Sequence, residues 1–489
     1  AHARSALGAL VADHHDVARN DLAVGQGVHG GLDVTVVLLG LQLRPDAPSS
    51  SWNLFKHPFT APCQASPRVS ECRPLAARRL GGQTRPVFID DQLLDSFAQR
   101  SLIRARGGGV EIGELVHAIS TVLDGGDHAW AASFTDLADK LAGVGDSAAS
   151  RGERATARDA YLRASTYYDL AGWPLFGAPV DPRLAATAAA SDAVFTKAMA
   201  NVSHHAEYLE IDLDGLAMPA WFFSADSSGT ARRTIINTNG YDSNVHEMYF
   251  AHALPALERG WNVLLFDGPG QGRCLIRDGA HLRPDWENVV APVLETASAR
   301  PDVQTDAIVL CGWSLGGWLA PRAAATHSDK LAALVADPGA WDQRNNVVAM
   351  LPLTDEEKQA FPNVDLAKLD PIQDWLTSDD VDPTMHWRIV GRGFWVNGVS
   401  NFAEYAVNMC DYTLSDRAAN ITCPTLITKA EGDPLGANAG LLFDAVGATK
   451  KDLIEFTAAD GVGGHCETEN RSVYNQRVFE WLEQVVPAR

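Results

Sequence analysis

Short apolar runs rich in branched residues recur through the second half of the chain, and each predicts a buried strand. Longer stretches that suit helices separate them, which is the pattern of an α/β protein with a mostly parallel sheet flanked by helices. The first two runs are typical of an antiparallel hairpin. The predicted strands lie at 208–213, 219–223, 233–238, 262–266, 307–311, 333–336, 424–429 and 452–456.

Residues 85–200 follow a different period, in which apolar side chains recur every three or four positions. This spacing predicts amphipathic helices whose aromatic residues form a core. We expect a helical domain over 85–200, with breaks at Gly125-Gly126-Asp127 and at Gly143-Val144-Gly145. Paired helices could also suggest a tetratricopeptide array, but the segment contains no repeat of fixed length. The periodic positions are Leu115, Ile119, Val122, Trp130, Phe134, Leu137, Leu141, Tyr161, Ala164 and Tyr168.

Residues 1–84 differ from the rest of the chain. They carry 8 Lys and Arg against 6 Asp and Glu, so their net charge is +2 while the whole chain carries −21. They hold Pro, Ser, His and Arg clusters without a sustained helical period, and they begin at Ala. We expect a poorly ordered extension, or sequence from upstream of the natural start; a small extra domain is the alternative.

Composition narrows the possible partners. The chain has 489 residues, of which 46% are hydrophobic and 21% charged, as in a globular protein. The charge of −21 argues against nucleic acid or an anionic membrane surface as a partner. No apolar run approaches the ~20 residues of a membrane span. Seven cysteines without regular spacing favour reduced thiols in a cytoplasmic protein.

The segment Gly312-Trp313-Ser314-Leu315-Gly316 follows a predicted strand and precedes a predicted helix. This context is that of a nucleophile elbow, a sharp turn that exposes a serine and needs glycines where the backbone passes close to its neighbours. A glycine-rich turn with a passive serine is the simpler interpretation. The strand and the helix on either side favour Ser314 as a nucleophile.

A nucleophilic serine needs a base, and the base needs a carboxylate to orient it. In this arrangement the acid and the histidine follow the serine in the chain. Asp433 comes just after the predicted strand at 424–429 and before a proline, so it is favoured over Glu431 as the acid. His465 follows the last predicted strand and a run of glycines. We therefore predict the triad Ser314, Asp433 and His465.

The same chemistry requires two N–H groups that bind the developing oxyanion. One is the N–H of Leu315, the residue after the nucleophile, and the other comes from the loop after an earlier strand. That loop follows 233–238, and we predict Tyr241 as the second donor. A purely structural turn is the alternative there.

The segment at about 340–420 is a long insertion between two predicted strands and can form a lid over the serine. Its aromatic residues suit an apolar or aromatic substrate, although they also suit packing between lid and core. The aromatic residues are Trp341, Phe361, Trp375, Trp387, Phe394 and Trp395.

Two other features carry no predicted chemistry. The loop Asp267–Gly272 is glycine-rich, but it lacks the spacing of phosphate-binding loops, so we expect a structural turn. Cys311 and Cys466 lie near the predicted catalytic positions and are interpreted as packing residues. We expect no cofactor and no metal.

Together these motifs resemble the α/β-hydrolase group that contains 2,6-dihydroxypseudooxynicotine hydrolase, fungal polyketide-shortening pigment hydrolases and the fermentation-respiration switch protein. The resemblance covers about 87–485 and rests on Asp285-Trp286-Glu287, the Asp267–Gly272 loop, Ser314, Gly464-His465-Cys466 and the segment 158–165. It implies a helical N-terminal cap over an α/β-hydrolase core at 201–489, often as a homodimer. Members hydrolyse C–C bonds next to carbonyls; the extra glutamate of the nicotine-pathway enzyme cannot be placed in this sequence.

The sequence therefore predicts a serine hydrolase that acts on a C–C, ester or amide bond of a small molecule. A non-catalytic regulatory or binding protein on the same scaffold is the alternative, because a fold alone does not fix a function. A peptidase is a weaker alternative, since residues 85–200 show helical periods and no propeller repeats.

Overall fold

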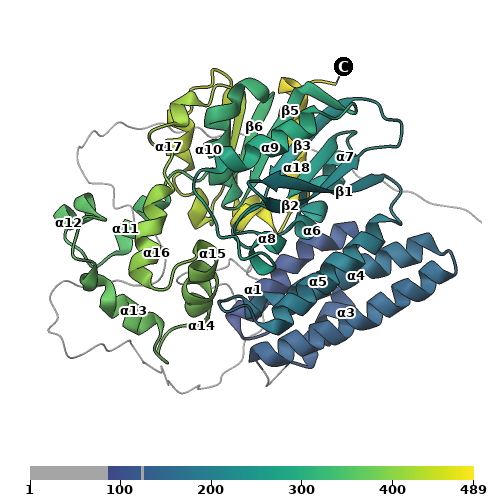
Figure 1. Cartoon of the computed structure of the whole chain (residues 1–489), viewed down its shortest axis with the longest axis horizontal. Helices are drawn as coiled ribbons and strands as arrows, with labels where there is room; N and C mark the ends of the chain where they lie inside the picture. Colours follow the sequence, from purple (N-terminus) through teal and green to yellow (C-terminus); the bar gives the residue numbers. More distant parts are fainter. Residues whose placement is uncertain (1–85, 123–125, 489) are drawn as a thin grey trace, which may run out of the picture. The chain divides into compact units, whose positions relative to one another are not determined.

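The computed structural model describes residues 86–122 and 126–488, so the predicted extension at 1–84 lies outside the described residues. Eight described strands form one sheet in the order β1-β2-β4-β3-β5-β6-β7-β8 (Figure 1). The β1–β2 hairpin and the β2–β4 pair are antiparallel, and the other neighbours are parallel. All eight predicted strands are confirmed. Their bounds are β1 His205–Leu213, β2 Leu216–Ser224, β3 Arg232–Thr238, β4 Asn262–Phe266, β5 Val303–Trp313, β6 Ala333–Asp337, β7 Thr425–Ala430 and β8 Lys451–Phe456.

Both faces of the sheet are buried under helices. In β4, Val263 and Leu265 belong to one hydrophobic cluster, and Leu264 and Phe266 belong to another. Because side chains alternate across a strand, these clusters lie on opposite faces. Residues of α9 and α10 join the cluster of Leu264, and residues of α6 and α18 join that of Val263. The helices of this part are α6 Val245–Met248, η3 Tyr249–Ala253, α7 Leu254–Leu257, α8 Gly272–Ile276, α9 Trp286–Ser298, α10 Gly316–His327, η4 Ser328–Lys330, η9 Pro434–Gly436, α17 Ala439–Ala445, η10 Ala458–Asp460, η11 His465–Glu467 and α18 Arg471–Val485.

The helices predicted within 85–200 are confirmed for the described residues. Their periodic positions face inward: Leu115, Trp130 and Phe134 are fully buried. The segment shares one hydrophobic cluster with a face of the sheet, and Phe195 packs edge-on against Trp221 of β2 at 5.5 Å. Its division from the sheet at residue 200 stays a prediction. The helices are α1 Gln92–Ser101, η1 Leu102–Gly107, α2 Ile112–Ser120, α3 Gly126–Ser150, α4 Arg154–Gly172, η2 Trp173–Leu175 and α5 Pro182–Met199.

The predicted break at Gly143-Val144-Gly145 is wrong, because α3 runs through it without interruption. Gly145 has a packing reason instead. A Cβ at this position would lie 2.5 Å from the ring of Tyr161 on α4, so the glycine lets the two helices approach closely. Helix propensity disfavours glycine only weakly, and packing of this kind overrides it.

The insertion between β6 and β7, at about 340–420, is a set of short helices; that it forms a lid over the serine stays a prediction. Trp387 donates a hydrogen bond from Nε1 to the main-chain oxygen of Trp173 at 2.9 Å, which joins the insertion to the helical segment. The helices are α11 Gln343–Met350, α12 Asp355–Ala360, η5 Leu366–Leu369, α13 Asp370–Leu376, α14 Pro383–His386, the π-helical η6 Trp387–Phe394, α15 Trp395–Asn397, α16 Phe402–Asn408, η7 Met409–Asp411 and η8 Ala418–Asn420.

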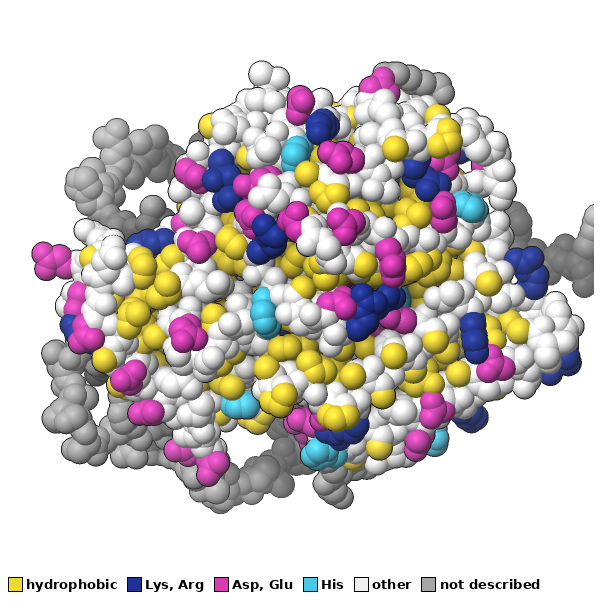
Figure 2. Space-filling view, in the orientation of Figure 1, with side chains coloured by type: hydrophobic (Ala, Val, Ile, Leu, Met, Phe, Trp, Pro, Cys, Tyr) yellow, Lys and Arg dark blue, Asp and Glu magenta, His cyan; other side chains and the backbone are white. Residues whose placement is uncertain are grey.

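The surface carries mixed charge. On the face shown in Figure 2, Asp and Glu side chains are spread among Lys and Arg side chains, and the described basic residues form no continuous strip there. None of the helices in the described part of the chain has both the length and the apolar character that crossing a membrane requires.

Candidate active site

Ser314 lies on the tight turn between β5 and α10, with a φ of 57°. Its N–H donates a hydrogen bond to the main-chain oxygen of Asp337 at 2.6 Å. The flanking glycines are required by close approach: a Cβ at Gly312 would overlap the main-chain oxygen of Gly316, and one at Gly316 would lie 2.6 Å from that of Thr238. The turn therefore has the strained geometry of a nucleophile elbow.

The structure brings the three predicted triad residues together. The hydroxyl of Ser314 lies 2.8 Å from Nε2 of His465, and Nδ1 of His465 lies 2.8 Å from Oδ2 of Asp433. Each residue follows a parallel strand, namely β5, β7 and β8, so all three stand at the carboxyl edge of the sheet. This arrangement can move a proton from a serine hydroxyl to an oriented imidazole.

The pairing of Asp433 with His465 favours the charged form of each side chain. The side chain of Asp433 is fully buried; burial raises its pKa, but the charge and hydrogen bond of His465 outweigh burial and lower it. The N–H groups of Leu435 and Cys466 also donate to this carboxylate. Desolvation lowers the pKa of His465, yet Asp433 outweighs it and the pKa is raised. Since 47% of the His465 side chain is exposed, water reaches the ring directly.

One predicted oxyanion donor is next to the serine in the chain, and the other follows a residue that packs against the serine. Leu315 is the next residue in the chain, and Gly240 packs so closely that a Cβ there would lie 3.1 Å from the Ser314 hydroxyl oxygen. Tyr241 directly follows Gly240. The N–H groups of Leu315 and Tyr241 have no hydrogen-bond acceptor among the described residues. Both are therefore available to a ligand bound at Ser314.

The loop Asp267–Gly272 forms a structural turn that supports the loop of Tyr241. Gln271 donates from Nε2 to the main-chain oxygens of Asn239 and Gly240, at 2.8 and 3.0 Å. Asn239 in turn donates to Asp267 at 2.5 Å. Burial raises the pKa of Asp267 to about 7, against the lowering influence of His246.

Sequence reasoning missed a second buried network beside the triad. Arg471 of α18 binds the carboxylate of Asp337 at 2.9 Å and the main-chain oxygen of Cys466 at 3.0 Å. The main-chain oxygen of Asp337 also accepts a hydrogen bond from the N–H of Ser314, so Asp337 links the elbow to the histidine loop. The sequence marks Asp337 only as the end of a strand, and its partner is 134 residues away.

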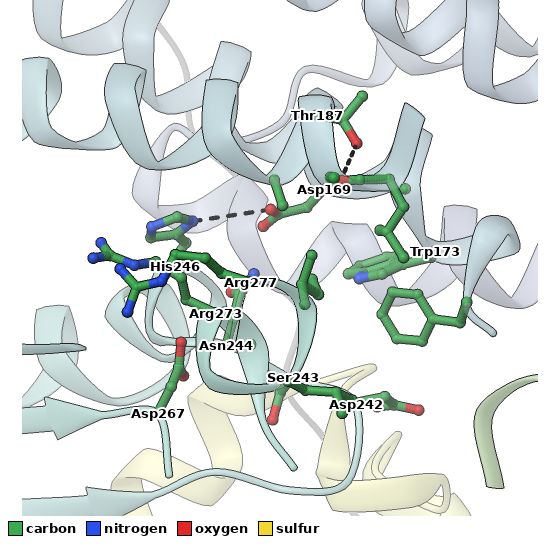
Figure 3. A pocket seen from close by; sticks show the side chains of 18 of the residues that line it. Asp169, Trp173, Thr187, Asp242, Ser243, Asn244, His246, Asp267, Arg273 and Arg277 are labelled. Carbon is green, nitrogen blue, oxygen red and sulfur yellow. Dashed lines mark hydrogen bonds and ion pairs between the residues drawn. The ribbon is translucent and has the colours of Figure 1, made fainter. Parts of the chain in front are cut away.

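A cavity of about 390 Å³ lies between the helical segment and the loops that follow β3 and β4 (Figure 3). Figure 3 shows Asp242 and Ser243 across the cavity from Asp169 and Thr187. Ser314 and His465 do not line it, but Tyr241 does, so the cavity adjoins the loop that contacts the serine. Its apolar lining includes Tyr168, Trp173, Phe176, Leu184, Leu275 and Trp395.

A serine after β5, an acid after β7 and a histidine after β8 of a mostly parallel sheet define the class of α/β-hydrolase folds. A family model described as the Alpha/beta hydrolase family matches residues 237–472. The hydrolase acrC of Aspergillus aculeatus is 30% identical over 422 residues, covering 79% of this chain and 94% of its own length. The chain therefore belongs to the alpha/beta hydrolase family and is a hydrolase, as the motifs predict.

Two further comparisons agree with this assignment. The 20-hydroxy-prefusarin hydrolase FUS2 of Gibberella moniliformis is 30% identical over 390 residues, which cover 77% of this chain and 92% of the relative. The crystal structure of 2,6-dihydroxy-pseudo-oxynicotine hydrolase superposes with a TM-score of 0.61 at 21% identity, covering 79% of this chain and 95% of that one. The structural match shows a shared fold, including the N-terminal helices.

Proposed function

We propose that the protein is a serine hydrolase of small carbonyl compounds, with Ser314 as nucleophile, His465 as general base and Asp433 as the orienting acid. The observation that carries the proposal is the continuous pair of 2.8 Å contacts from the serine hydroxyl through the imidazole to a buried carboxylate. Similar constellations perform acyl transfer on unrelated folds.

In the proposed reaction, His465 accepts the proton of Ser314 while the serine oxygen attacks the carbonyl carbon of the substrate. The carbonyl oxygen becomes an oxyanion, which the N–H groups of Leu315 and Tyr241 bind. The bond to the leaving group then breaks, and His465 returns the proton to that group. Water, deprotonated by His465, releases the acyl part and restores Ser314.

The cavity beside Tyr241 supports an apolar or aromatic substrate. Its volume of about 390 Å³ falls within the ~300–1,000 Å³ range of small-molecule sites. The relative FUS2 is named for a small organic substrate, 20-hydroxy-prefusarin, which supports the same class here. We propose a C–C bond next to a carbonyl, or an ester, as the bond that is cleaved.

Replacing the nucleophile tests this function. Ser314→Ala should abolish hydrolysis of aryl esters and β-diketones and prevent labelling by a fluorophosphonate, while Ser147→Ala, an exposed change on α3, should leave both intact. Products identified by mass would show which bond is cleaved. Unchanged hydrolysis by the Ser314→Ala variant would refute the assignment of the nucleophile.

A cytoplasmic location and a homodimer complete the proposal. The five cysteines within the described residues are free, which supports a reducing compartment. Size-exclusion chromatography with light scattering would test the dimer.

A further inference from the structure

The residue after the proposed oxyanion donor Tyr241 is held from two distant parts of the chain. Arg100 of α1 binds Oδ1 of Asp242 at 2.8 Å, and Arg392 of η6 binds Oδ2 at 2.5 Å. One arginine belongs to the helical segment and the other to the insertion between β6 and β7. The carboxylate of Asp242 thus joins both segments to the loop beside Ser314.

Each arginine is itself fixed. Arg100 also binds both oxygens of Glu247 at 2.7 and 2.5 Å, and its guanidinium lies 4.7 Å from the ring of Trp173. Arg392 lies over two rings, those of Tyr241 at 4.9 Å and Trp387 at 5.1 Å. Such paired and stacked guanidinium groups have little freedom, so they constrain the carboxylate that they bind.

Asp242 stays ionised in its ion pairs with Arg100 and Arg392. The side chains of Arg100, Arg392 and Asp242 are only 19%, 22% and 14% exposed, so water screens them weakly. Burial raises the pKa of Asp242, but the two guanidinium groups outweigh burial and hold it well below its usual range. Asp242 is therefore an anion bound on both sides throughout the neutral pH range.

Only Tyr241 separates Asp242 from Gly240, the residue that packs against Ser314, and this loop is also supported from the other side. The N–H of Gly240 donates to the hydroxyl of Ser243 at 3.0 Å, and Gln271 holds the main-chain oxygen of Gly240. These contacts place residue 240 against Ser314. The bond from Gln271 also holds one end of the peptide that carries the N–H of Tyr241, because the carbonyl of Gly240 belongs to that peptide. The side chain of Asp242 anchors the residue that follows Tyr241, so this short stretch of main chain is held on both sides.

We propose that Asp242 is a positioning residue, which aims the N–H of Tyr241 at the oxyanion through its ion pairs with Arg100 and Arg392. This inference rests on the proposed serine hydrolase function. If Asp242 has this role, the oxyanion site is complete only when Arg100 of the helical segment and Arg392 of the insertion both contact the loop of Tyr241.

The test is a comparison of kcat with KM for p-nitrophenyl acetate. Removing one oxyanion donor outright lowers kcat by about 10²–10³, so its misalignment in Asp242→Asn should lower kcat by about 10- to 100-fold. KM should change little, because the oxyanion exists only in the transition state. Affinity for 2,2,2-trifluoroacetophenone, which forms a tetrahedral adduct with serine, should fall in parallel with kcat. Glu153→Gln, which breaks the exposed pair with Arg151, is the matched control and should change neither.

A second variant keeps the test decisive if Asp242→Asn does not fold. Arg392→Met removes one ion pair and leaves Arg100 bound, so it should give a smaller loss of kcat with the same unchanged KM. Combined with Asp242→Asn, it should add little further loss, because both changes break one contact. Unchanged kcat and adduct affinity in folded Asp242→Asn or Arg392→Met protein would overturn the inference.

The proposed function has its own readout in the same assay. If Ser314→Ala abolishes hydrolysis and Asp242→Asn does not slow it, only the role of Asp242 is wrong. If Ser314→Ala hydrolyses the ester as fast as the unmodified protein, the serine mechanism fails and the role of Asp242 fails with it.

Discussion

Nε2 of His246 lies 3.2 Å from Oδ1 of Asp192, which joins α6 beside the sheet to α5 of the helical segment. The other ring nitrogen lies 3.1 Å from the hydroxyl of Ser191 and 3.9 Å from Asp169 (Figure 3). Burial lowers the pKa of His246, but the hydrogen bonds and charges of the two acids outweigh it and raise the pKa to about 9. The buried imidazolium therefore links the two parts of the structure at neutral pH.

This link predicts a pH-dependent stability. Because the folded pKa exceeds the unfolded value of about 6.5, the stabilisation is complete below pH 6.5 and is lost as the pH rises through 9. At most about 3 kcal/mol of unfolding free energy should disappear over this range. Urea denaturation at several pH values should show the loss in the unmodified protein and a flatter profile for His246→Gln. Parallel profiles would contradict the role of His246.

The pH dependence of hydrolysis should report His465. Its imidazole must be neutral to accept a proton, so kcat/KM should rise with pH through a pKa above the usual histidine value of about 6.5. Asp433→Asn removes the charge that raises this pKa, and it should shift the inflection to lower pH and reduce kcat by about 10⁴-fold. Glu431→Gln is the control, because Glu431 accepts the N–H of Ala458 and does not contact His465 in the hydrogen-bond network. An unshifted inflection in Asp433→Asn would argue against the pairing.

Cys466 should be inert although its sulfur lies 3.4 Å from Nε2 of His465. Burial raises the pKa of this thiol well above its usual value, so the nucleophilic thiolate is scarce. Iodoacetamide should leave Cys466 unmodified in the folded protein, as measured by mass spectrometry, and modify it after denaturation. Cys466→Ala should keep most of the hydrolytic activity. Rapid inactivation that this substitution prevents would show the packing interpretation to be wrong.

Two glycines in the same helix should respond oppositely to alanine. At Gly143 a Cβ meets nothing within 4 Å, so Gly143→Ala should stabilise the protein by about 1 kcal/mol through helix propensity. At Gly145 the Cβ would overlap Tyr161, so Gly145→Ala should lower the melting temperature. Thermal unfolding of both variants tests the contact between α3 and α4. A gain in stability from both substitutions would contradict the close approach.

Local patterns predicted the sheet and the proximity of Ser314, Asp433 and His465. Parallel strands align their carboxyl ends, so residues that follow three such strands meet at one edge even when they are distant in sequence. The predicted break at 143–145 is wrong because the reason for Gly145, its close contact with the ring of Tyr161, is tertiary and leaves no local pattern in the sequence. The ion pairs of Asp242 could not be predicted for the same reason, because its partners are 142 and 150 residues away. A charged residue in a loop is usually solvated, so the sequence gives no sign of such a pairing.

The triad and the cavity are built from different elements of the fold. Strand ends of one sheet hold the three triad residues, whereas one wall of the cavity comes from α4, α5 and α15, which lie outside the sheet, and faces the segments that follow β3 and β4. Substitutions in α4, α5 and α15 can therefore alter the size and polarity of the ligand space without moving the strands. Directed evolution toward new substrates should accordingly find most of its useful changes in the helical segment and the insertion, and few in the sheet.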